Sequence, residues 1–87
     1  MGATFYILYS TGADSFYVGH TSEPIEGRLR KHNSGHAGFT GKFRDWKVVY
    51  IEKYELKTLA YAREREVKQW KSSKRIRKLI QGSEHPA

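Results

Sequence analysis

The sequence predicts a small α/β protein of the α+β type, in which helices flank a three-stranded antiparallel sheet. Three runs of β-branched and aromatic residues, at 4–10, 16–20 and 46–51, are typical of strands. Three segments space their apolar residues as helices do; the first ends near residues 33–35, and the others cover 57–71 and 74–80. The resulting order, ββαβαα, favours a mixed domain whose helices cover the sheet.

The first two strands are expected to form a hairpin. Residues 11–15, Thr-Gly-Ala-Asp-Ser, are typical of a turn, and they join two strand-like runs. A five-residue connection of this kind favours antiparallel pairing. The third strand begins at Trp46, which we expect to be buried, although a base-stacking role for this ring stays open.

Each predicted helix has recognisable boundaries. Thr21 or Ser22 can cap the first helix, with Pro24 in its first turn. Residues 72–73 separate the second helix from a short terminal one. The apolar residues expected to face the core are Leu59, Ala60, Val67 and Trp70 on the second helix and Ile76, Leu79 and Ile80 on the third.

Length and charge narrow the possible functions. The 87 residues favour one domain over 1–87, with its core at about 4–80 and a frayed tail at 82–87. Lys and Arg number 16 against 9 Asp and Glu, a net charge of +7, and residues 53–87 alone carry ten basic and four acidic side chains. A basic half indicates an anionic partner such as nucleic acid, or else a solvated helical face. Charge alone leaves both open.

Several kinds of site are excluded. Without cysteine the chain can form neither a disulfide nor a thiolate metal site, and its four histidines lack the spacing of a structural zinc site. No apolar run reaches the roughly 20 residues of a membrane span, and no secretory signal is visible. Motifs for a phosphate-binding loop or a serine hydrolase are also missing. We therefore expect a soluble protein without membrane contact.

The residues that remain for chemistry are dispersed along the chain. They are Tyr6 and Tyr17 on the hairpin, Arg28 and His32 on the first helix, and Glu64 or Glu66 on the long helix. At about 100° per residue, Arg28 and His32 lie about 40° apart, and His32 lies about 20° from Ile25. Both therefore border the apolar stripe, where a guanidinium and an imidazole can hold a phosphate. From the residues alone, a surface Arg and a half-buried His is the favoured interpretation.

Four short motifs follow one another along the chain. They read Tyr6-Ile7-Leu8-Tyr9-Ser10, Tyr17-Val18-Gly19-His20-Thr21, His32-Asn33-Ser34-Gly35 and Lys68-Gln69-Trp70-Lys71-Ser72. With Arg28 and Glu64 between them, this ordered set resembles the GIY-YIG endonuclease superfamily over about residues 4–80, and in particular its stand-alone bacterial members. One departure is visible: the first motif reads Thr4-Phe5-Tyr6, so it lacks the family's glycine and keeps the tyrosine.

The resemblance implies a nuclease and a set of catalytic residues. Tyr6 and Tyr17 match the two motif tyrosines, and Gly19 matches the third residue of the second motif. Arg28 matches the helix arginine, His32 the position four residues later, and Glu64 the single metal-binding carboxylate. Glu66 is a rival for Glu64 because its helical projection lies closer to Leu59 and Trp70, but the family's spacing selects Glu64.

These residues suggest a mechanism for phosphodiester hydrolysis. Glu64 would hold one Mg²⁺ or Mn²⁺ ion per active site, with water and phosphate oxygens in the other positions. Arg28 would neutralise a non-bridging oxygen. Tyr6 is the expected general base, which requires a phenol pKa below its usual value of ~10. Tyr17 would orient water or phosphate, and His32 would share the base role or bind the phosphate.

DNA is the expected partner, and six basic residues are expected to bind it. They are Lys42, Lys68, Lys71, Lys74, Arg75 and Lys78. The resemblance implies cleavage that leaves a 5′-phosphate and a 3′-hydroxyl, in repair, recombination or processing of structured DNA. It also implies a bacterial cytoplasmic setting, with a partner protein or a homodimer as options.

Two other classes of function are open at this point. One is a nucleic-acid-binding module that uses the basic C-terminal helices without cutting. The other is a scaffold domain whose charge serves solubility. Metal-dependent cutting distinguishes the nuclease from both.

Overall fold

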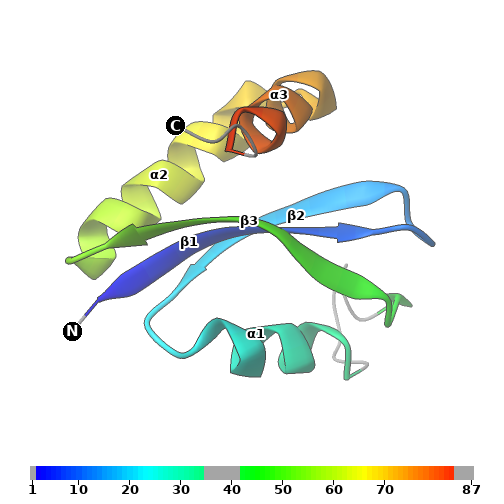
Figure 1. Ribbon diagram of the computed structural model, residues 1–87, viewed down its shortest axis with the longest axis horizontal. Helices are drawn as coiled ribbons and strands as arrows, with labels where there is room; N and C mark the ends of the chain where they lie inside the picture. Colours follow the sequence, from blue (N-terminus) through cyan, green and yellow to red (C-terminus); the bar gives the residue numbers. More distant parts are fainter. Residues whose placement is uncertain (1, 35–41, 84–87) are drawn as a thin grey trace.

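A three-stranded antiparallel sheet forms the middle layer of the protein, with helices on both faces, as a computed structural model shows (Figure 1). The structure describes residues 2–34 and 42–83. Strand β1 (Ala3–Ser10) lies at the centre and pairs with β2 (Ser15–Thr21) on one side and β3 (Trp46–Tyr54) on the other. The predicted fold class and the order ββαβαα are confirmed.

The helices divide between the two faces of the sheet. Helix α1 (Ile25–His32) lies on one face, and α2 (Lys57–Trp70) and α3 (Ser73–Ser83) lie on the other (Figure 1). Because both faces are covered, the central strand is apolar on both sides: Phe5 and Ile7 pack toward α2, whereas Tyr6 and Leu8 pack toward α1. The core is therefore two clusters that share β1 as a common wall.

The clusters contain most of the expected core residues. The cluster under α2 and α3 joins the buried residues Phe5, Ile7, Val18 and Val67 to the half-buried Trp70, Ile76, Leu79 and Ile80. The cluster above α1 consists of Tyr6, Leu8 and Trp46, with Tyr17, Ile25 and Leu29 against it. Trp46 is buried as expected. Leu59, by contrast, is 50% exposed, so the apolar stripe of α2 centres on Ala60 and Val67.

Local side-chain bonds explain where the first helix begins. Neither Thr21 nor Ser22 caps α1, because Pro24 occupies the N-cap position and no side chain bonds to the helix start. Thr21 Oγ1 instead accepts a bond from the Glu23 amide at 2.9 Å, which shapes the turn before the helix. The predicted capping residues were wrong for this reason.

A left-handed residue separates the two C-terminal helices. Lys71 has φ 49° and ψ 41°, which ends α2, and Ser72 Oγ accepts a bond from the Arg75 amide at 3.2 Å, which caps α3. Helix α3 begins one residue before the predicted start and ends at Ser83, three residues after Ile80. Residues 84–87 of the predicted tail lie outside the described residues.

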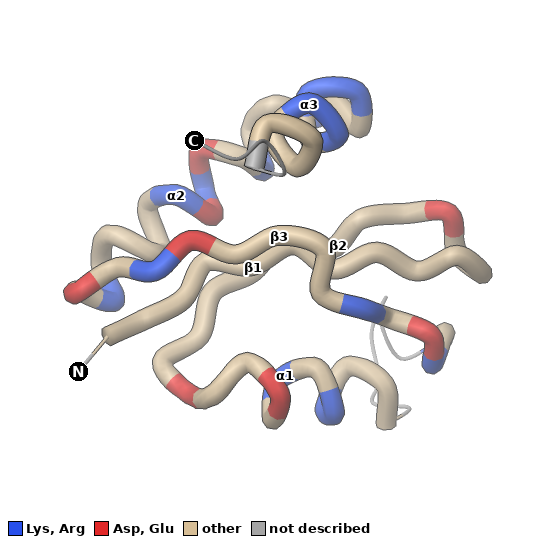
Figure 2. The backbone as a smooth tube through the Cα atoms, in the orientation of Figure 1, with Lys and Arg blue, Asp and Glu red and all other residues tan. Residues whose placement is uncertain are grey.

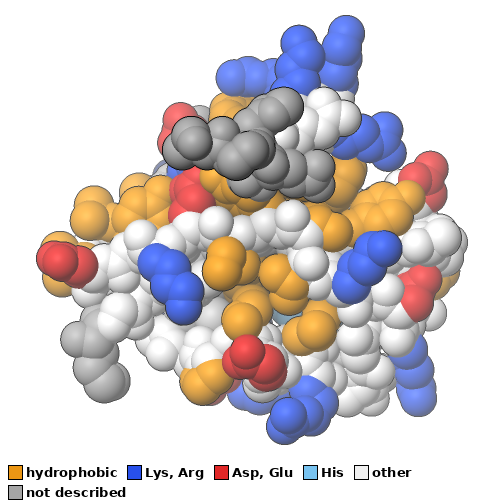
Figure 3. All heavy atoms as spheres, in the orientation of Figure 1, with side chains coloured by type: hydrophobic (Ala, Val, Ile, Leu, Met, Phe, Trp, Pro, Cys, Tyr) orange, Lys and Arg blue, Asp and Glu red, His pale blue; other side chains and the backbone are white. Residues whose placement is uncertain are grey.

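Charge and apolar surface occupy different parts of the molecule. Lys and Arg concentrate on α3, whereas acidic and basic positions alternate on α1 and α2 (Figure 2). Figure 3 shows apolar side chains gathered between β3 and α1, where Ile25, Leu29 and Val48 line a hollow. Within residues 2–34 and 42–83, no helix combines the length and the apolar composition that crossing a membrane requires.

Candidate active site

The site is built around Tyr6, a fully buried phenol on the central strand. Tyr6 lies opposite Gly19 of β2 in the antiparallel register. A Cβ placed on Gly19 would meet Tyr6 Oη at 2.7 Å and Cζ at 2.8 Å, distances that real Cβ atoms do not show. The glycine of the Tyr17-Val18-Gly19 motif therefore leaves the space in which the phenol lies.

His32 contacts both motif tyrosines. Its Nε2 lies 3.0 Å from Tyr6 Oη, and its ring centroid lies 4.6 Å from that of Tyr17. The end of α1 is held in place by the next residue, Asn33, whose side chain accepts a bond from the Trp46 amide at 2.8 Å and donates one to the Trp46 carbonyl at 3.0 Å. This pair of hydrogen bonds to β3 fixes the end of α1, and with it the buried imidazole of His32 between the two phenols.

Arg28 lies one helical turn before His32 and beside Tyr6. The neighbouring Tyr6 hydroxyl raises the pKa of Arg28 by hydrogen bonding, so the guanidinium stays charged. Among the residues that the structure describes, Arg28 Nε is a buried side-chain nitrogen that has no hydrogen-bond partner. A buried donor without a partner is costly, and it marks a position where an external acceptor would bind.

The phenol of Tyr6 is neutral in this arrangement. Burial raises its pKa above 10, and the nearby Tyr17 and Glu64 add to the rise, while Arg28 opposes it without reversing it. This direction is opposite to the lowered pKa that a tyrosine base requires. In the free protein Tyr6 is therefore poised to exchange a hydrogen bond with His32, rather than to remove a proton by itself.

Glu64 reaches the same site from α2. Its side chain is 13% exposed, and its two oxygens lie 2.6 Å from His20 Nδ1 and 2.7 Å from Lys68 Nζ. Burial would raise the pKa of Glu64, but the bonds from His20 and Lys68 hold it below its usual value. Lys68 Nζ also lies 5.9 Å from the centre of the Tyr17 ring, so Glu64 and the tyrosines border one site.

Glu66 points elsewhere. Its side chain is 60% exposed and bonds to Arg63 Nη1 at 3.1 Å. Because the buried stripe of α2 centres on Ala60, Glu64 lies about 40° from the stripe and Glu66 about 120° from it. The rivalry between the two carboxylates arose from their projections relative to Leu59 and Trp70. Leu59 is 50% exposed, which removes one of these two reasons, whereas Trp70 is half-buried against the core.

The structure thus brings together the five residues that the sequence singled out: Tyr6, Tyr17, Arg28, His32 and Glu64. Of the six basic residues expected on DNA, Lys68 lies at this site and bonds Glu64. The others are exposed and lie on the loop before β3, at the end of α2 or on α3; they are Lys42, Lys71, Lys74, Arg75 and Lys78.

His20 is a site residue to which sequence reasoning assigned no role. Because side chains alternate along β2, His20 lies on the same face as Val18, the face that α2 covers. Tyr17 and Gly19 lie on the opposite face, toward α1. An imidazole on an otherwise apolar strand face was the available signal. The partner, Glu64, is 44 residues away, which hid the pairing.

The donor set fits a single hydrated cation. Within the described residues no three His, Asp or Glu side chains gather as metal ligands, so Glu64 would be the protein's carboxylate ligand, beside the oxygens of two phenols. Magnesium binds through one or two carboxylates and keeps several waters. Oxygen donors of this kind match such an ion, provided that Lys68 yields its position on Glu64 Oε2.

Comparisons with known proteins agree with this geometry. The family described as GIY-YIG catalytic domain matches residues 2–78. UPF0213 proteins of Staphylococcus aureus strains Mu3, Mu50 and N315 are each 33% identical over 78 residues, which cover 88% of this chain and 94% of each relative. No solved structure matches. The family match spans the sheet, the helix that bears Arg28 and the helix that bears Glu64, which confirms the resemblance: the chain belongs to the GIY-YIG family of nuclease domains.

Proposed function

We propose that this protein is a Mg²⁺- or Mn²⁺-dependent endonuclease that hydrolyses phosphodiester bonds of DNA, one strand per site, leaving a 5′-phosphate and a 3′-hydroxyl. The observation that carries the proposal is the convergence of Arg28, Tyr6, Tyr17, His32 and Glu64 around Gly19. A cation, two phenols, an imidazole and a carboxylate can supply charge stabilisation, proton transfer and a metal ligand to phosphate hydrolysis.

Arg28 would hold the scissile phosphate. Its Nε is buried without a partner, so a non-bridging phosphate oxygen would supply the missing acceptor. The Tyr6 hydroxyl lies beside the guanidinium and raises the pKa of Arg28, so the positive charge is kept. A positive charge held in place before the reaction stabilises the charge that develops on phosphate in the transition state.

Glu64 would hold the divalent ion, with His20 fixing one carboxylate oxygen. The ion, when bound, supplies Lewis-acid polarisation of the phosphate and a water of lowered pKa. Lys68 occupies the other carboxylate oxygen in the free protein. When DNA binds, the ammonium group of Lys68 would exchange its bond to Glu64 for a bond to a nearby phosphate oxygen.

Tyr6 and His32 would together handle the proton. Because burial raises the pKa of Tyr6, the phenol acts best as a relay: its oxygen accepts the proton of the attacking water while its own proton passes to His32 Nε2, 3.0 Å away. Tyr17, whose ring lies tilted against that of His32, would orient the water or the phosphate.

The exposed basic residues would hold the flanking DNA. Helix α3 carries Lys74, Arg75 and Lys78, and Lys71 precedes it (Figure 2). The Arg75 side chain is also held by a cation–π contact, because its guanidinium lies 4.4 Å from the centre of the Trp70 ring. We assign the protein to repair, recombination or processing of structured DNA in the cytoplasm, acting alone, as a pair or with a partner protein.

The test is cleavage of supercoiled plasmid, flap and branched DNA with Mg²⁺ or Mn²⁺, comparing wild type with Glu64→Ala and Glu66→Ala. We expect Glu64→Ala to lower the rate more than about 100-fold. Glu66→Ala is the matched control and should cut as wild type does, because its carboxylate faces solvent.

Two results would contradict the proposal. If no substrate is cut with either metal, and binding nevertheless weakens steeply with salt, the protein is a binding module. If Glu66→Ala loses cutting while Glu64→Ala keeps it, the carboxylate assignment is wrong.

A further inference from the structure

An exposed aromatic pair lies beside the Glu64 carboxylate. Tyr61 on α2 is 47% exposed, and its ring centroid lies 5.2 Å from that of His20 on β2, at an interplanar angle of 48°. Together with Lys57 and Thr58 of the first helical turn, the two rings line a hollow at the surface. The mechanism above uses His20 and leaves Tyr61 without a role.

The pair is continuous with the candidate active site. The nitrogen of His20 that faces α2 lies 2.6 Å from Glu64 Oε1. Tyr61 precedes Glu64 by three residues, which places the two side chains about 60° apart on the helix. Neighbouring nucleotides of one strand are separated by about 3.4 Å of rise. A phosphate held next to the ion on Glu64 would therefore bring the adjacent nucleotide within reach of the two rings.

Charge around the hollow suits a nucleotide. None of the four residues that line it is a carboxylate, and Lys57 is among them. The Arg65 guanidinium lies 5.7 Å from the centre of the Tyr61 ring, and Lys68 bonds the nearby Glu64. The anionic backbone of DNA is thus matched by cations around an aromatic surface, which is the combination that single-stranded nucleic-acid sites use.

We propose that Tyr61, with His20 beside it, is a stacking site for an unpaired nucleobase next to the bond that is cut. In a fully paired duplex each base is covered by its neighbours, so an aromatic side chain at the protein surface finds a free base face at a flap, a bulge or a strand end. This inference rests on the proposed nuclease function, and it names the substrate class: DNA with an unpaired nucleotide at the cleavage position.

The test measures base stacking without cleavage. Flap DNA with 2-aminopurine at its unpaired junction nucleotide, and the same duplex with 2-aminopurine paired, are titrated with protein in EDTA. Wild type and Tyr61→Phe should quench the unpaired fluorophore and bind that DNA more tightly than the paired form. Tyr61→Leu keeps the apolar bulk and loses the ring, so it should lose the quenching. It should also lower the ratio of the affinity for the unpaired DNA to that for the paired DNA roughly fivefold to a hundredfold.

Leu59→Ala is the matched control, because Leu59 is 50% exposed on the same helix and lies outside the hollow. It should keep the wild-type ratio. If Tyr61→Leu keeps both the ratio and the quenching, the stacking site is wrong, even if the protein cuts DNA. If the ring-dependent quenching is present and no metal supports cutting, the stacking site stands and the nuclease proposal fails.

Discussion

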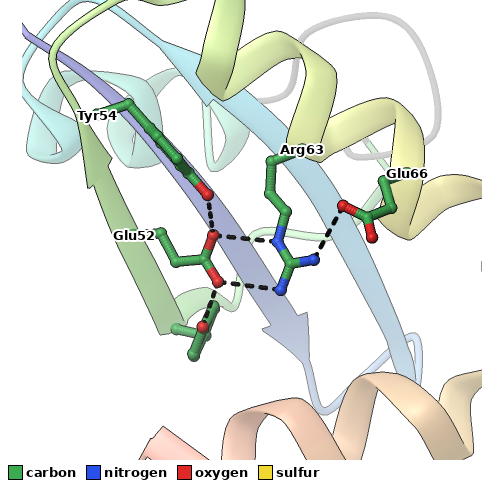
Figure 4. A network of polar contacts seen from close by, with 5 residues as sticks. Glu52, Tyr54, Arg63 and Glu66 are labelled. Atoms are coloured by element: carbon green, nitrogen blue, oxygen red, sulfur yellow. Dashed lines mark hydrogen bonds and ion pairs between the residues drawn. The ribbon is translucent and has the colours of Figure 1, made fainter.

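Arg63 and Glu64 are neighbouring residues of α2 that belong to two different polar clusters. The clusters differ in whether all their hydrogen-bonding groups have partners within the protein. Arg63 enters a closed network with Glu52 of β3: its Nε and Nη2 each bond one oxygen of the Glu52 carboxylate at 3.1 Å, and its Nη1 bonds Glu66 (Figure 4). Tyr54 donates to the same carboxylate at 2.6 Å. The Tyr50 hydroxyl also donates to this carboxylate. Every guanidinium nitrogen has a partner within the protein.

The cluster that Glu64 enters is open by contrast. Arg28, the arginine on that side, keeps its buried Nε without a partner among the described residues. Lys68 bonds Glu64 through a long and half-exposed side chain that is free to turn away. The difference teaches how to tell a structural network from a binding site: the first satisfies its own donors and acceptors, and the second leaves some for a ligand.

The two arginines give the largest expected contrast. Arg28→Lys keeps the charge and removes the planar donor set, so we expect cleavage to slow about 100- to 1,000-fold with little change in unfolding free energy. Arg63→Lys should show the reverse, losing roughly 1.5–3 kcal/mol of stability because the two bonds to Glu52 cannot both be replaced. Single-turnover rates and urea unfolding of the two variants measure both effects.

The contrast would be wrong if Arg28→Lys unfolded at a lower urea concentration than Arg63→Lys while cutting normally. In that case the unpartnered Nε of Arg28 would reflect local packing, and the phosphate would have to bind another cation. Lys68, which lies beside Tyr17, would be the next residue to substitute.

The space over Gly19 gives the second contrast. In Gly19→Ala the new methyl group must displace the Tyr6 phenol, so we expect a stability loss of about 1–3 kcal/mol and slower cleavage. Gly27→Ala is the control, because a Cβ there meets no atom within 4 Å, and alanine in a helix is favoured over glycine by up to about 1 kcal/mol. Thermal unfolding and plasmid cutting would separate the two glycines.

Equal behaviour of the two glycine variants would contradict the assigned role of Gly19. It would mean that Tyr6 can move without cost, and that its contact with His32 is not needed for cutting.

Much of this architecture could be predicted from local patterns. The strands and helices follow from residue preference and spacing, and the convergence of Tyr6, Arg28 and Glu64 followed from the ordered motifs. The pairing of His20 with Glu64 could not be predicted, because the partners lie on different elements 44 residues apart. Helical projection alone placed Glu66 closer to Leu59 and Trp70, and the family's spacing selected Glu64; the structure adds that Leu59 is 50% exposed.

Properties that depend on packing were the least predictable. The resemblance suggests a tyrosine base whose pKa has to be lowered by the metal, its water or Arg28; in the free protein the burial of Tyr6 raises that pKa. Strand β3 continues to Tyr54, three residues past the predicted end at Ile51. In the structure Glu52 is half-buried by its bonds to Arg63 and two tyrosines, partners that no local pattern contains.

The smallest expected effect concerns the pH dependence of the closed network. Burial would raise the pKa of Glu52, but bonds from Tyr50, Tyr54 and Arg63 hold it below its usual 4.5. The folded protein therefore binds this proton less readily than the unfolded chain does. The stability that results is fully present above the usual carboxyl pKa and is lost as pH falls through the lower folded value. Burial and Glu52 also raise the pKa of Tyr50 to about 12, so its hydroxyl stays a donor throughout this range.

Urea unfolding between neutral pH and about pH 3 measures this linkage, whose slope cannot exceed about 1.4 kcal/mol per pH unit for one proton. We expect Glu52→Gln to flatten the acid limb of the wild-type curve and Glu66→Gln to leave it unchanged, because Glu66 is 60% exposed and has one bond to the same arginine. Neither variant should alter cleavage as Arg28→Lys does. An acid limb as steep in Glu52→Gln as in wild type would show that other carboxylates dominate it, and the closed network would then have no measurable part in acid stability.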